Sequence, residues 1–416
     1  MGFEVRRINP ITPQLNMLRN RTNIFAKFYL IAIILYISQG ILFEGTWFTF
    51  LSGLYLLSFN MYAMLKVLVR QHRSLLFSLL IIIIGWIIFL WFISSKSYRF
   101  EGEVVSTMYM VEYSIIVFSS FFSFYYISIN SLVRKYHLRA FILFLGVIYV
   151  YNVLNYDVAN ASVGDYDFST VNNKSYSIVA LFPLLSFFWD KKWFMLLLMT
   201  MALFFVTFCL KRGAIIIAAS YYMVSIIYVF IGRNKNVLNK RFIQLLVLAL
   251  VAGVVYALMS IYNSNDLIQA RIELTLEGSS SGRDYIYAKI WKAWEDSSLI
   301  FQVIGHGPIS TLSAAPNYAH NDWLEILYDF GILGLLLYLA ISVYLFKYWK
   351  KNKMPMPHKL GILMCLLYII LRSSFSMCIY ELDSLLVFGY IGYIMGDNYL
   401  RQKEFLMMSI NKNEVK

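Results

Sequence analysis

Long runs of apolar residues, separated by short polar segments, cover most of this chain of 416 residues. A run of about 20 apolar residues is long enough to cross a bilayer as a helix. About twelve such runs can be placed, near positions 24–43, 46–65, 75–93, 107–129, 138–154, 176–189, 193–210, 213–231, 241–262, 331–348, 360–378 and 384–400. Only Asp190, Lys191 and Lys192 separate the sixth run from the seventh, so this pair is the least distinct. The pattern predicts an all-α, polytopic membrane protein.

The first run is expected to remain in the protein as a span. Several arginines precede it, but it is longer than the core of a signal peptide, and no small-residue cleavage site follows it. Three parts are therefore expected along the chain. Residues 1–262 form an N-terminal transmembrane bundle of about nine spans, 263–330 form a large loop with two short helices, and 331–416 form C-terminal transmembrane helices and a tail.

Composition supports a membrane protein. The chain is 60% hydrophobic and only 14% charged, with a mean hydropathy of +0.63, whereas about 25% of the residues of a soluble domain are charged. The three cysteines, Cys209, Cys365 and Cys378, lie within apolar runs and lack the spacing of a metal site. We expect them to be packing residues, with no disulfide framework and no zinc site.

The positions of the basic residues predict the orientation. Most of the 36 Lys and Arg residues lie in one set of loops, with both termini, while the acidic residues concentrate in the other set. Loops rich in Lys and Arg face the cytoplasm, so both termini are expected to be cytoplasmic, in a bacterial inner membrane. This topology, with anionic lipid at the inner leaflet, explains the net charge of +13 and removes the case for nucleic-acid binding.

Two segments on the predicted outer side are more polar than simple connections. Residues 155–175 mix tyrosine, aspartate and asparagine, a composition that suits contacts with sugar and equally suits a solvated loop. Residues 263–330 are long enough to carry function or to fold on themselves. Ser281 and Asp284 have the spacing of a helix-capping box.

The long segment is expected to contain two helices. Four residues spaced on one helical face, Tyr287, Ile290, Trp291 and Trp294, predict an aromatic helix lying on the membrane interface. This helix should end by the sequence Gly305-His306-Gly307-Pro308. A second helix is expected to start near Asn317, to carry His320 with two leucines on one face, and to break at Gly331.

Basic residues on this outer side suggest an anionic ligand. Arg283 would lie in the first turn of its helix, where the helix dipole already favours an anion, and its planar fork suits phosphate oxygens. A surface pair with Asp284 explains it equally well. Lys211 and Arg212 lie at the start of a span, on the side of the membrane that is poor in cations. Such residues either bind a ligand or are interfacial cations whose side chains extend to the membrane surface. A lipid-linked diphosphate shared by Arg212 and Arg283 is plausible.

Histidines and nearby polar residues complete the candidate site. His320 changes charge near neutral pH and is suited to accept a proton from a hydroxyl nucleophile, although a structural role is the alternative. His306, between two glycines, is favoured as a loop residue, and a two-histidine metal site lacks a convincing third ligand. Arg372, Glu381 and Asp383 are expected to form an ion-pair network. The residues expected to support the site are Lys211, Asn321, Asp322, Glu325, His306 and Arg372.

These residues resemble the motifs of the O-antigen polymerase and O-antigen ligase superfamily. His320-Asn321, nine residues, Gly331, two residues and Gly334 are similar to the family's H-N-x9-G-x2-G signature. Arg212-Gly213 at the start of a span, Gly282-Arg283 and Gly305-x-Gly307 resemble the segments that precede the histidine. The region with these motifs runs from about 210 to 346, and elsewhere only the topology agrees.

The resemblance implies a metal-independent, inverting glycosyltransferase that uses undecaprenyl-diphosphate-linked glycan and needs no cofactor. Arg212 and Arg283 would bind the diphosphate, and His320 would activate the acceptor hydroxyl at the periplasmic face. Flanking arginines should lower the pKa of His320. The favoured activity is O-antigen polymerase in lipopolysaccharide biosynthesis, with a chain-length regulator protein as a further partner. An O-antigen ligase acting on lipid A-core is the alternative, and a flippase is the less favoured one.

Overall fold

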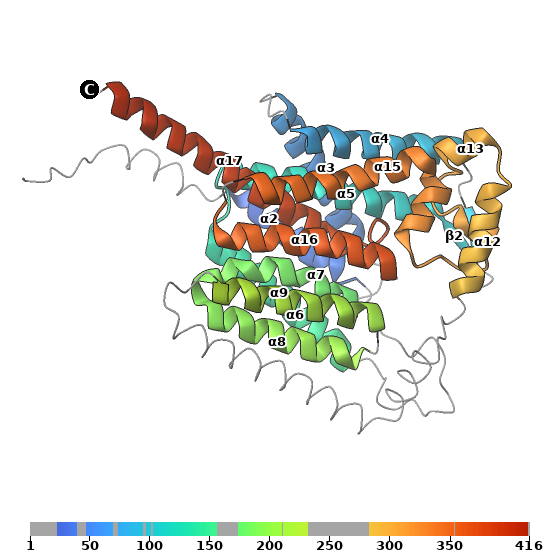
Figure 1. Ribbon diagram of the computed structural model, residues 1–416, viewed down its shortest axis with the longest axis horizontal. Helices are drawn as coiled ribbons and strands as arrows, with labels where there is room; N and C mark the ends of the chain where they lie inside the picture. Colours follow the sequence, from blue (N-terminus) through green and yellow to red (C-terminus); the bar gives the residue numbers. More distant parts are fainter. Residues whose placement is uncertain are drawn as a thin grey trace, which may run out of the picture.

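The computed structural model describes residues 23–39, 47–69, 74–94, 97–100, 103–155, 174–209, 211–231, 283–352 and 354–414. These residues are mostly helical, and the long helices run side by side (Figure 1). Three features of the sequence analysis lie outside the described residues: the span expected at 241–262, nearly all of the segment 155–175, and Ser281 of the capping box.

The helices follow the apolar runs closely. The first group is α2 (Ile24–Ile37), α3 (Trp47–Val69), α4 (Leu75–Ile93), α5 (Thr107–Ile129) and α6 (Lys135–Leu154). The second is α7 (Ser175–Leu185), the 3-10 turn η3 (Ser186–Lys191), α8 (Lys192–Phe208) and α9 (Arg212–Ile231). The third is α12 (Arg283–Glu295), α13 (Leu299–Ile304), α14 (Thr311–Ala314), α15 (Asp322–Lys351), α16 (Met356–Phe375) and α17 (Ser384–Glu414).

Among the described residues, eight helical stretches are long and apolar enough to cross a membrane. One of them is the stretch 175–208, where the chain turns at η3 so that α7 and α8 pack against each other. The chain is therefore a multispanning membrane protein, and the separation of the sixth and seventh predicted runs is present. The helix α2 is shorter, at 14 residues.

The centre of the bundle is the packing of α17 against α5. Gly389, Gly392 and Gly396 lie along the α17 face that meets α5, and a Cβ added at Gly392 would lie 2.1 Å from the carbonyl oxygen of Phe121. Small residues allow helix backbones to approach closely where lipid provides no hydrophobic drive for association. This contact fixes the start of α17, and with it the segment 376–383.

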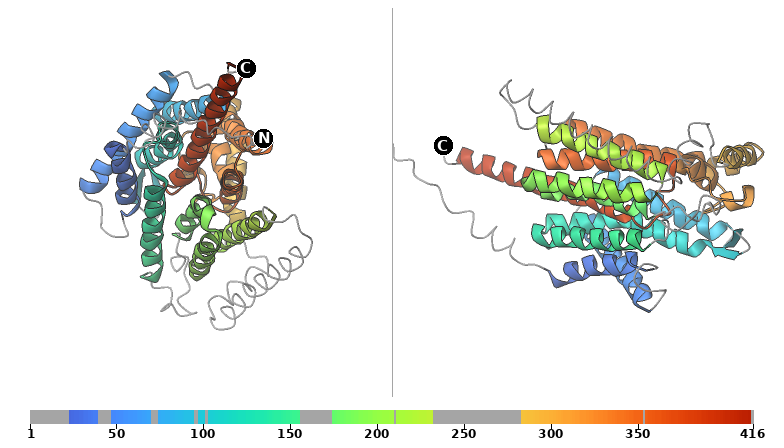
Figure 2. Two further views of the ribbon diagram at one scale, coloured as in Figure 1. Left: turned by 90° about the vertical axis from the view of Figure 1, so that its left-hand side faces the viewer. Right: turned by 90° about the horizontal axis from the view of Figure 1, so that it is seen from below.

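Short elements gather at one end of the bundle, opposite the end of α17 (Figures 1 and 2). They include α12, α13 and a hairpin of β1 (Ser97–Phe100) and β2 (Glu103–Ser106), paired antiparallel with Ser97 opposite Ser106. We call this end the site end. The hairpin corrects the all-α expectation, since strands of four residues are too short to give a clear alternation in the sequence.

The predicted apolar face of α12 packs largely against protein. Tyr287, Ile290 and Trp294 pack in a small core with Ala319 and Tyr328, whereas Trp291 is 46% exposed. A periodic apolar face fits a protein neighbour as well as a lipid one, and the position of α12 at the membrane interface stays a prediction. The helix also ends at Glu295, and the separate helix α13 follows it before Gly305, where the sequence analysis expected one helix.

The predicted break at Gly331 is present, as a kink inside α15. Gly331 has φ +68° and ψ −174°, and Gly305 has φ +90°, values that favour glycine. The two backbones touch: a Cβ added at Gly331 would lie 2.3 Å from the oxygen of Val303 and 2.6 Å from the nitrogen of Gly305. The kink therefore separates the segment 322–330 from the long span 331–351 and docks α13 against it.

We expect Gly331→Ala to destabilise the protein by at least about 2 kcal/mol, because the new methyl group meets backbone and the residue must keep a positive φ. Thermal unfolding in detergent measures the effect. Gly85→Ala, in α4, is the matched control, since nothing lies within 4 Å of its new Cβ. Equal unfolding temperatures for the two variants would contradict the role of the Gly305–Gly331 contact.

Candidate functional site

His320 lies immediately before α15, not on a helix that begins near Asn317 as expected. The side chain of Asn321 accepts hydrogen bonds from the backbone N–H of Trp323 (3.0 Å) and Leu324 (3.4 Å), so Asn321 is the N-cap and α15 begins at Asp322. An N-cap residue has an extended backbone, so the helix begins only after it. His320 is thereby left in the preceding turn.

The backbone of His320 is in the left-handed region, with φ +52°, which is uncommon for a residue other than glycine. Its neighbours on both sides are fixed. The Ala319 N–H donates to Glu325 Oε1 at 2.5 Å, and Asn321 caps the helix. Strained backbone of this kind persists where surrounding contacts over-determine it. The turn therefore fixes the backbone that carries the partly exposed imidazole.

Glu325 belongs to a row of three fully buried carboxylates, Asp322, Glu325 and Asp329, on one face of the segment 322–330. Glu325 also accepts from Thr311 Oγ1 at 2.5 Å. Asp329 accepts from the N–H of Ile309 and Thr311 and from the hydroxyls of Ser310 and Tyr380, at 2.6–3.1 Å. Asp322 accepts from Ser373 Oγ (2.8 Å) and the Cys378 N–H (2.7 Å). The row ties two loops, 309–320 and 376–383, to one helix.

The first turn of α9 meets the end of α16 in the same region. A Cβ added at Gly213 would lie 2.5 Å from Tyr176 Oη and 2.6 Å from Phe375 Cβ, so only glycine allows this approach. Arg283, in the first turn of α12 as predicted, donates from Nη1 to the carbonyl oxygen of Phe375 at 3.2 Å. Arg212 is the first residue of α9. Phe375 therefore contacts the residue after Arg212 and also accepts the hydrogen bond from Arg283.

Burial, and then the charges of Lys211 and Arg283, lower the pKa of His320 to about 4. Both effects disfavour the imidazolium form, so the ring is neutral at neutral pH and able to accept a proton. The predicted direction of the shift is confirmed. The two cations that lower the pKa of His320 are Lys211 and Arg283. The sequence analysis expected two arginines, Arg212 and Arg283, to have this effect.

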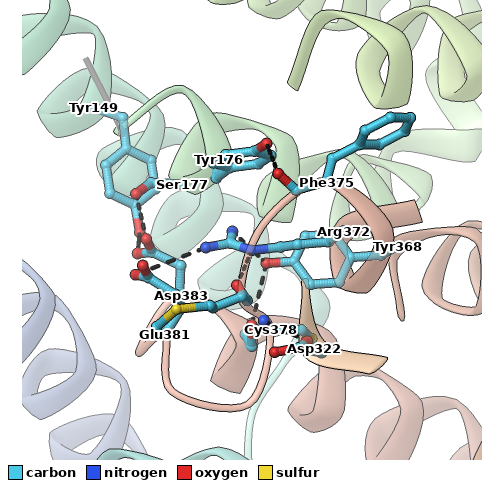
Figure 3. A network of polar contacts seen from close by, with 12 residues as sticks. Tyr149, Tyr176, Ser177, Asp322, Tyr368, Arg372, Phe375, Cys378, Glu381 and Asp383 are labelled. Atoms are coloured by element: carbon cyan, nitrogen blue, oxygen red, sulfur yellow. Dashed lines mark hydrogen bonds and ion pairs between the residues drawn. The ribbon is translucent and has the colours of Figure 1, made fainter. Parts of the chain in front are cut away.

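Arg372 lies in a buried polar network between α7, α16 and the segment 376–383 (Figure 3). Its guanidinium donates to the carbonyl oxygen of Met377 (2.6 Å) and to Tyr368 Oη (2.7 Å), and lies 4.5 Å from the centre of the Tyr176 ring. Its nitrogen Nη2 is 3.7 Å from Glu381 Oε2, so the predicted ion pair between these residues is present. Arg372 thus supports both Tyr176 and the 376–383 segment.

Asp383 has different partners from those expected. It accepts hydrogen bonds from Tyr149 Oη at 2.8 Å and from Ser177 Oγ, which ties α6 and α7 to the start of α17 (Figure 3). Sequence analysis missed Tyr149, Tyr176 and Ser177. Single hydroxyl-bearing residues within apolar runs carry no signal of their own, because their role depends on the residues opposite them.

Glu381 is partly accessible. Its side chain is 43% accessible, yet surrounding protein raises its pKa by burial, an effect that the charge of Arg372 partly offsets. The charge of Lys211 acts on both Glu381 and His320, so both side chains lie within electrostatic range of the same cation.

His306 has a packing role in the loop. Its ring stacks between Phe301 and Tyr328, with centroids 4.9 and 4.3 Å away. Its nitrogens lie 3.1 Å from Ser297 Oγ and 3.3 Å from the Tyr328 carbonyl oxygen. Within the part of the chain that the structure describes, no three His, Cys, Asp or Glu side chains gather in a way that would hold a metal ion.

Comparison with known families gives a match to part of the chain. The fold is a multispanning helical membrane protein whose polar residues converge at one end. Residues 194–339, which include Arg212, Arg283 and His320, match the family described as O-Antigen ligase. This match confirms the resemblance to the O-antigen ligase and polymerase superfamily. No curated protein matches the chain.

Lys211→Ala and Arg283→Ala are each expected to raise the pKa of His320 from about 4 toward the ordinary 6.5, because each removes a charge that repels the proton. Titration of histidine-labelled protein by ¹⁵N NMR, with His320→Gln to assign the signal, measures this shift. The exposed Lys292 supplies a control, Lys292→Ala, that should leave the pKa in place. An unmoved pKa in both test variants would refute the proximity of the cations.

Glu325→Leu is expected to destabilise the protein by about 1–3 kcal/mol, because the Ala319 N–H and the Thr311 hydroxyl lose their acceptor. Glu325→Gln keeps an acceptor oxygen and should retain most of the stability. Thermal unfolding measures both. The ¹⁵N signal of His320 should move in the leucine variant more than in the glutamine variant, and the reverse order would contradict the positioning role of Glu325.

Proposed function

We propose that this protein is an O-antigen polymerase that transfers a glycan from an undecaprenyl-diphosphate donor to a hydroxyl of a lipid-linked repeat unit. The observation that carries the proposal is a neutral imidazole, His320, held within electrostatic range of two cations, Lys211 and Arg283, at one end of a membrane bundle. A base and an anion site side by side are what this transfer requires. The family match supports the same class of substrate.

The chemistry follows from these charges. The acceptor oxygen attacks the anomeric carbon, the bond from that carbon to the diphosphate oxygen breaks, and the acceptor proton passes to His320. Arg283, Arg212 and Lys211 stabilise the negative charge that develops on the departing diphosphate, which is the main catalytic requirement. Attack opposite the diphosphate inverts the anomeric centre. No step in this scheme requires a metal ion.

The site is proposed to face the periplasm of a bacterial inner membrane, with both termini cytoplasmic. Three described helical elements have a terminal lysine at the end of the bundle opposite the site: α6 begins at Lys135, η3 ends at Lys191 and α15 ends at Lys351. Basic residues mark the cytoplasmic ends of spans. Lipid-linked glycan is then the partner at the site end, and a chain-length regulator protein is a further partner.

An O-antigen ligase, which transfers the glycan to lipid A-core, is the second candidate. The description of the matched family favours it, and the same three residues would serve both reactions. The preference for a polymerase comes from the tyrosine- and asparagine-rich composition of 155–175, which suits a second glycan substrate. A flippase has less support, because transporters place their ionisable groups near the bilayer midplane.

In a strain that lacks the gene, His320→Ala, Arg212→Ala and Arg283→Ala should each fail to restore long-chain surface polysaccharide. Loss of general-base catalysis alone reduces rates by about 100- to 10,000-fold. Gel analysis of the polysaccharide, at matched expression, measures the effect, with Lys292→Ala as a cation control at the same end. Normal chains from all three variants would overturn the proposal.

The lipopolysaccharide of the strain without the gene separates the candidates. A missing polymerase leaves single repeat units on the core, and a missing ligase leaves long chains on the lipid carrier. A missing flippase traps repeat units at the cytoplasmic face.

A further inference from the structure

A second group of polar and aromatic side chains lies at the site end, on the last turn of α2, just beyond that helix, and on the first two turns of α5. Its members, which we call the tyrosine–glutamate cluster, are Tyr36, Gln39, Tyr109, Glu112 and Tyr113. None of them belongs to the site described above. The family match also begins later in the chain, at residue 194.

The cluster is ordered by its own contacts. Tyr36 Oη donates to Glu112 Oε1 at 2.7 Å, and Gln39 Nε2 donates to Tyr113 Oη at 3.2 Å. The rings of Tyr36 and Tyr113 meet edge to face, 6.2 Å apart at 89°. Behind them, Gly53 of α3 provides room, since a Cβ there would lie 2.8 Å from the Tyr36 ring and 3.2 Å from Glu112 Oε1.

The cluster is buried at its base and open on its other side. Tyr36 is 3% exposed, whereas Tyr109 is 65% exposed, and Gln39, Glu112 and Tyr113 are partly exposed. A carboxylate near the edge of an apolar span is costly and normally has a charged partner or a ligand. Among the described residues, no Lys, Arg or His lies within ion-pair distance of Glu112.

The cluster lies beside the 376–383 segment. Ser114, the residue after Tyr113 in α5, donates from Oγ to the carbonyl oxygen of Ile379 at 3.0 Å, and the charge of Glu381 acts on Tyr113. The charge of Lys211 acts on both Glu381 and His320. The segment that carries Glu381 is therefore a common neighbour of the cluster and of the cation that acts on His320.

The chemistry of the cluster indicates the class of ligand. Carboxylate and amide groups bind many hydroxyls at once, and exposed tyrosine rings offer a flat apolar face beside a polar tip. A sugar has both hydroxyls and a flat face of C–H groups. Glu112 and Glu381 repel an anion, so the diphosphate is not the ligand here. An aliphatic chain would cover the carboxylate and offer it no hydrogen bond beyond the one from Tyr36.

We propose that the tyrosine–glutamate cluster binds a sugar ring of the lipid-linked glycan, across Glu381 from His320. This proposal rests on the proposed function, because it requires a glycan substrate whose diphosphate lies near Arg283. Glu112 accepts hydrogen bonds from sugar hydroxyls, and Tyr109 and Tyr113 stack on the ring. The cluster therefore selects the glycan, while the cations hold its carrier.

The test measures binding to full-length protein in lipid nanodiscs, by native mass spectrometry, with three probes. These are undecaprenyl diphosphate, the lipid-linked oligosaccharide extracted from the strain that lacks the gene, and the same oligosaccharide released from its carrier. Glu112→Gln and Tyr109→Ala should each raise the Kd for both oligosaccharides about 10-fold, as expected for the loss of one hydrogen bond or contact to the sugar. The Kd for undecaprenyl diphosphate should not change.

Matched variants make the outcomes distinct. Glu112→Gln keeps an acceptor for Tyr36, and Tyr109 is exposed, so both variants should fold. Tyr136→Ala removes an exposed tyrosine, 55% accessible, at the opposite end of the bundle and should leave every Kd unchanged. Unchanged oligosaccharide binding in both cluster variants, or equal weakening for all probes, would overturn the sugar site.

A failure of the proposed function gives a different result. Wild-type protein would then bind undecaprenyl diphosphate no more tightly than Arg283→Ala does. Cluster-dependent binding of the released oligosaccharide would still support the sugar site in that case.

Discussion

The burial of three carboxylates on one face of the segment 322–330 is the constraint on which the site depends. A buried carboxylate without partners is very unfavourable, and here nearly all of the partners come from two loops, as backbone N–H and hydroxyl groups. The hydrogen bonds that Asp329 accepts hold the 309–311 turn and the Tyr380 side chain. The hydrogen bond that Glu325 accepts from the Ala319 N–H positions the backbone next to His320. These hydrogen bonds therefore stabilise the observed arrangement of the two loops.

The charged side chains at the site end differ in sign from one region to the next. Burial together with Lys211 and Arg283 keeps His320 neutral, and the same cations attract an anion. When such an anion binds, it offsets their charge and should make the imidazole a stronger base. Glu381 and Glu112, at the same end of the bundle, repel an anion instead. The site end thus carries cations within range of His320 and separate carboxylates on α5 and the 376–383 segment.

Several features could be predicted because they depend on residues close together in the sequence. Apolar runs placed the described helices, Gly331 marked the kink, and Arg283 begins its helix as expected. The sequence analysis expected the helix that became α15 to start near Asn317, whereas it starts at Asp322. Residue spacing alone did not show that Asn321 would cap the helix. The face of α12 was assigned to lipid because hydropathy does not distinguish a lipid neighbour from Ala319 and Tyr328.

The sequence by itself determined the membrane class, the order of the spans, the resemblance to the O-antigen ligase and polymerase superfamily, and the identity of His320, Arg212 and Arg283 as candidates. Only the tertiary structure decided which groups meet them. Arg283 and Phe375 are 92 positions apart, and Asp383 reaches Tyr149 across 234. Hydropathy and helix signals report on neighbours within a turn or a span. Contacts over such separations depend on helix packing, through close approaches such as those at Gly213 and Gly392.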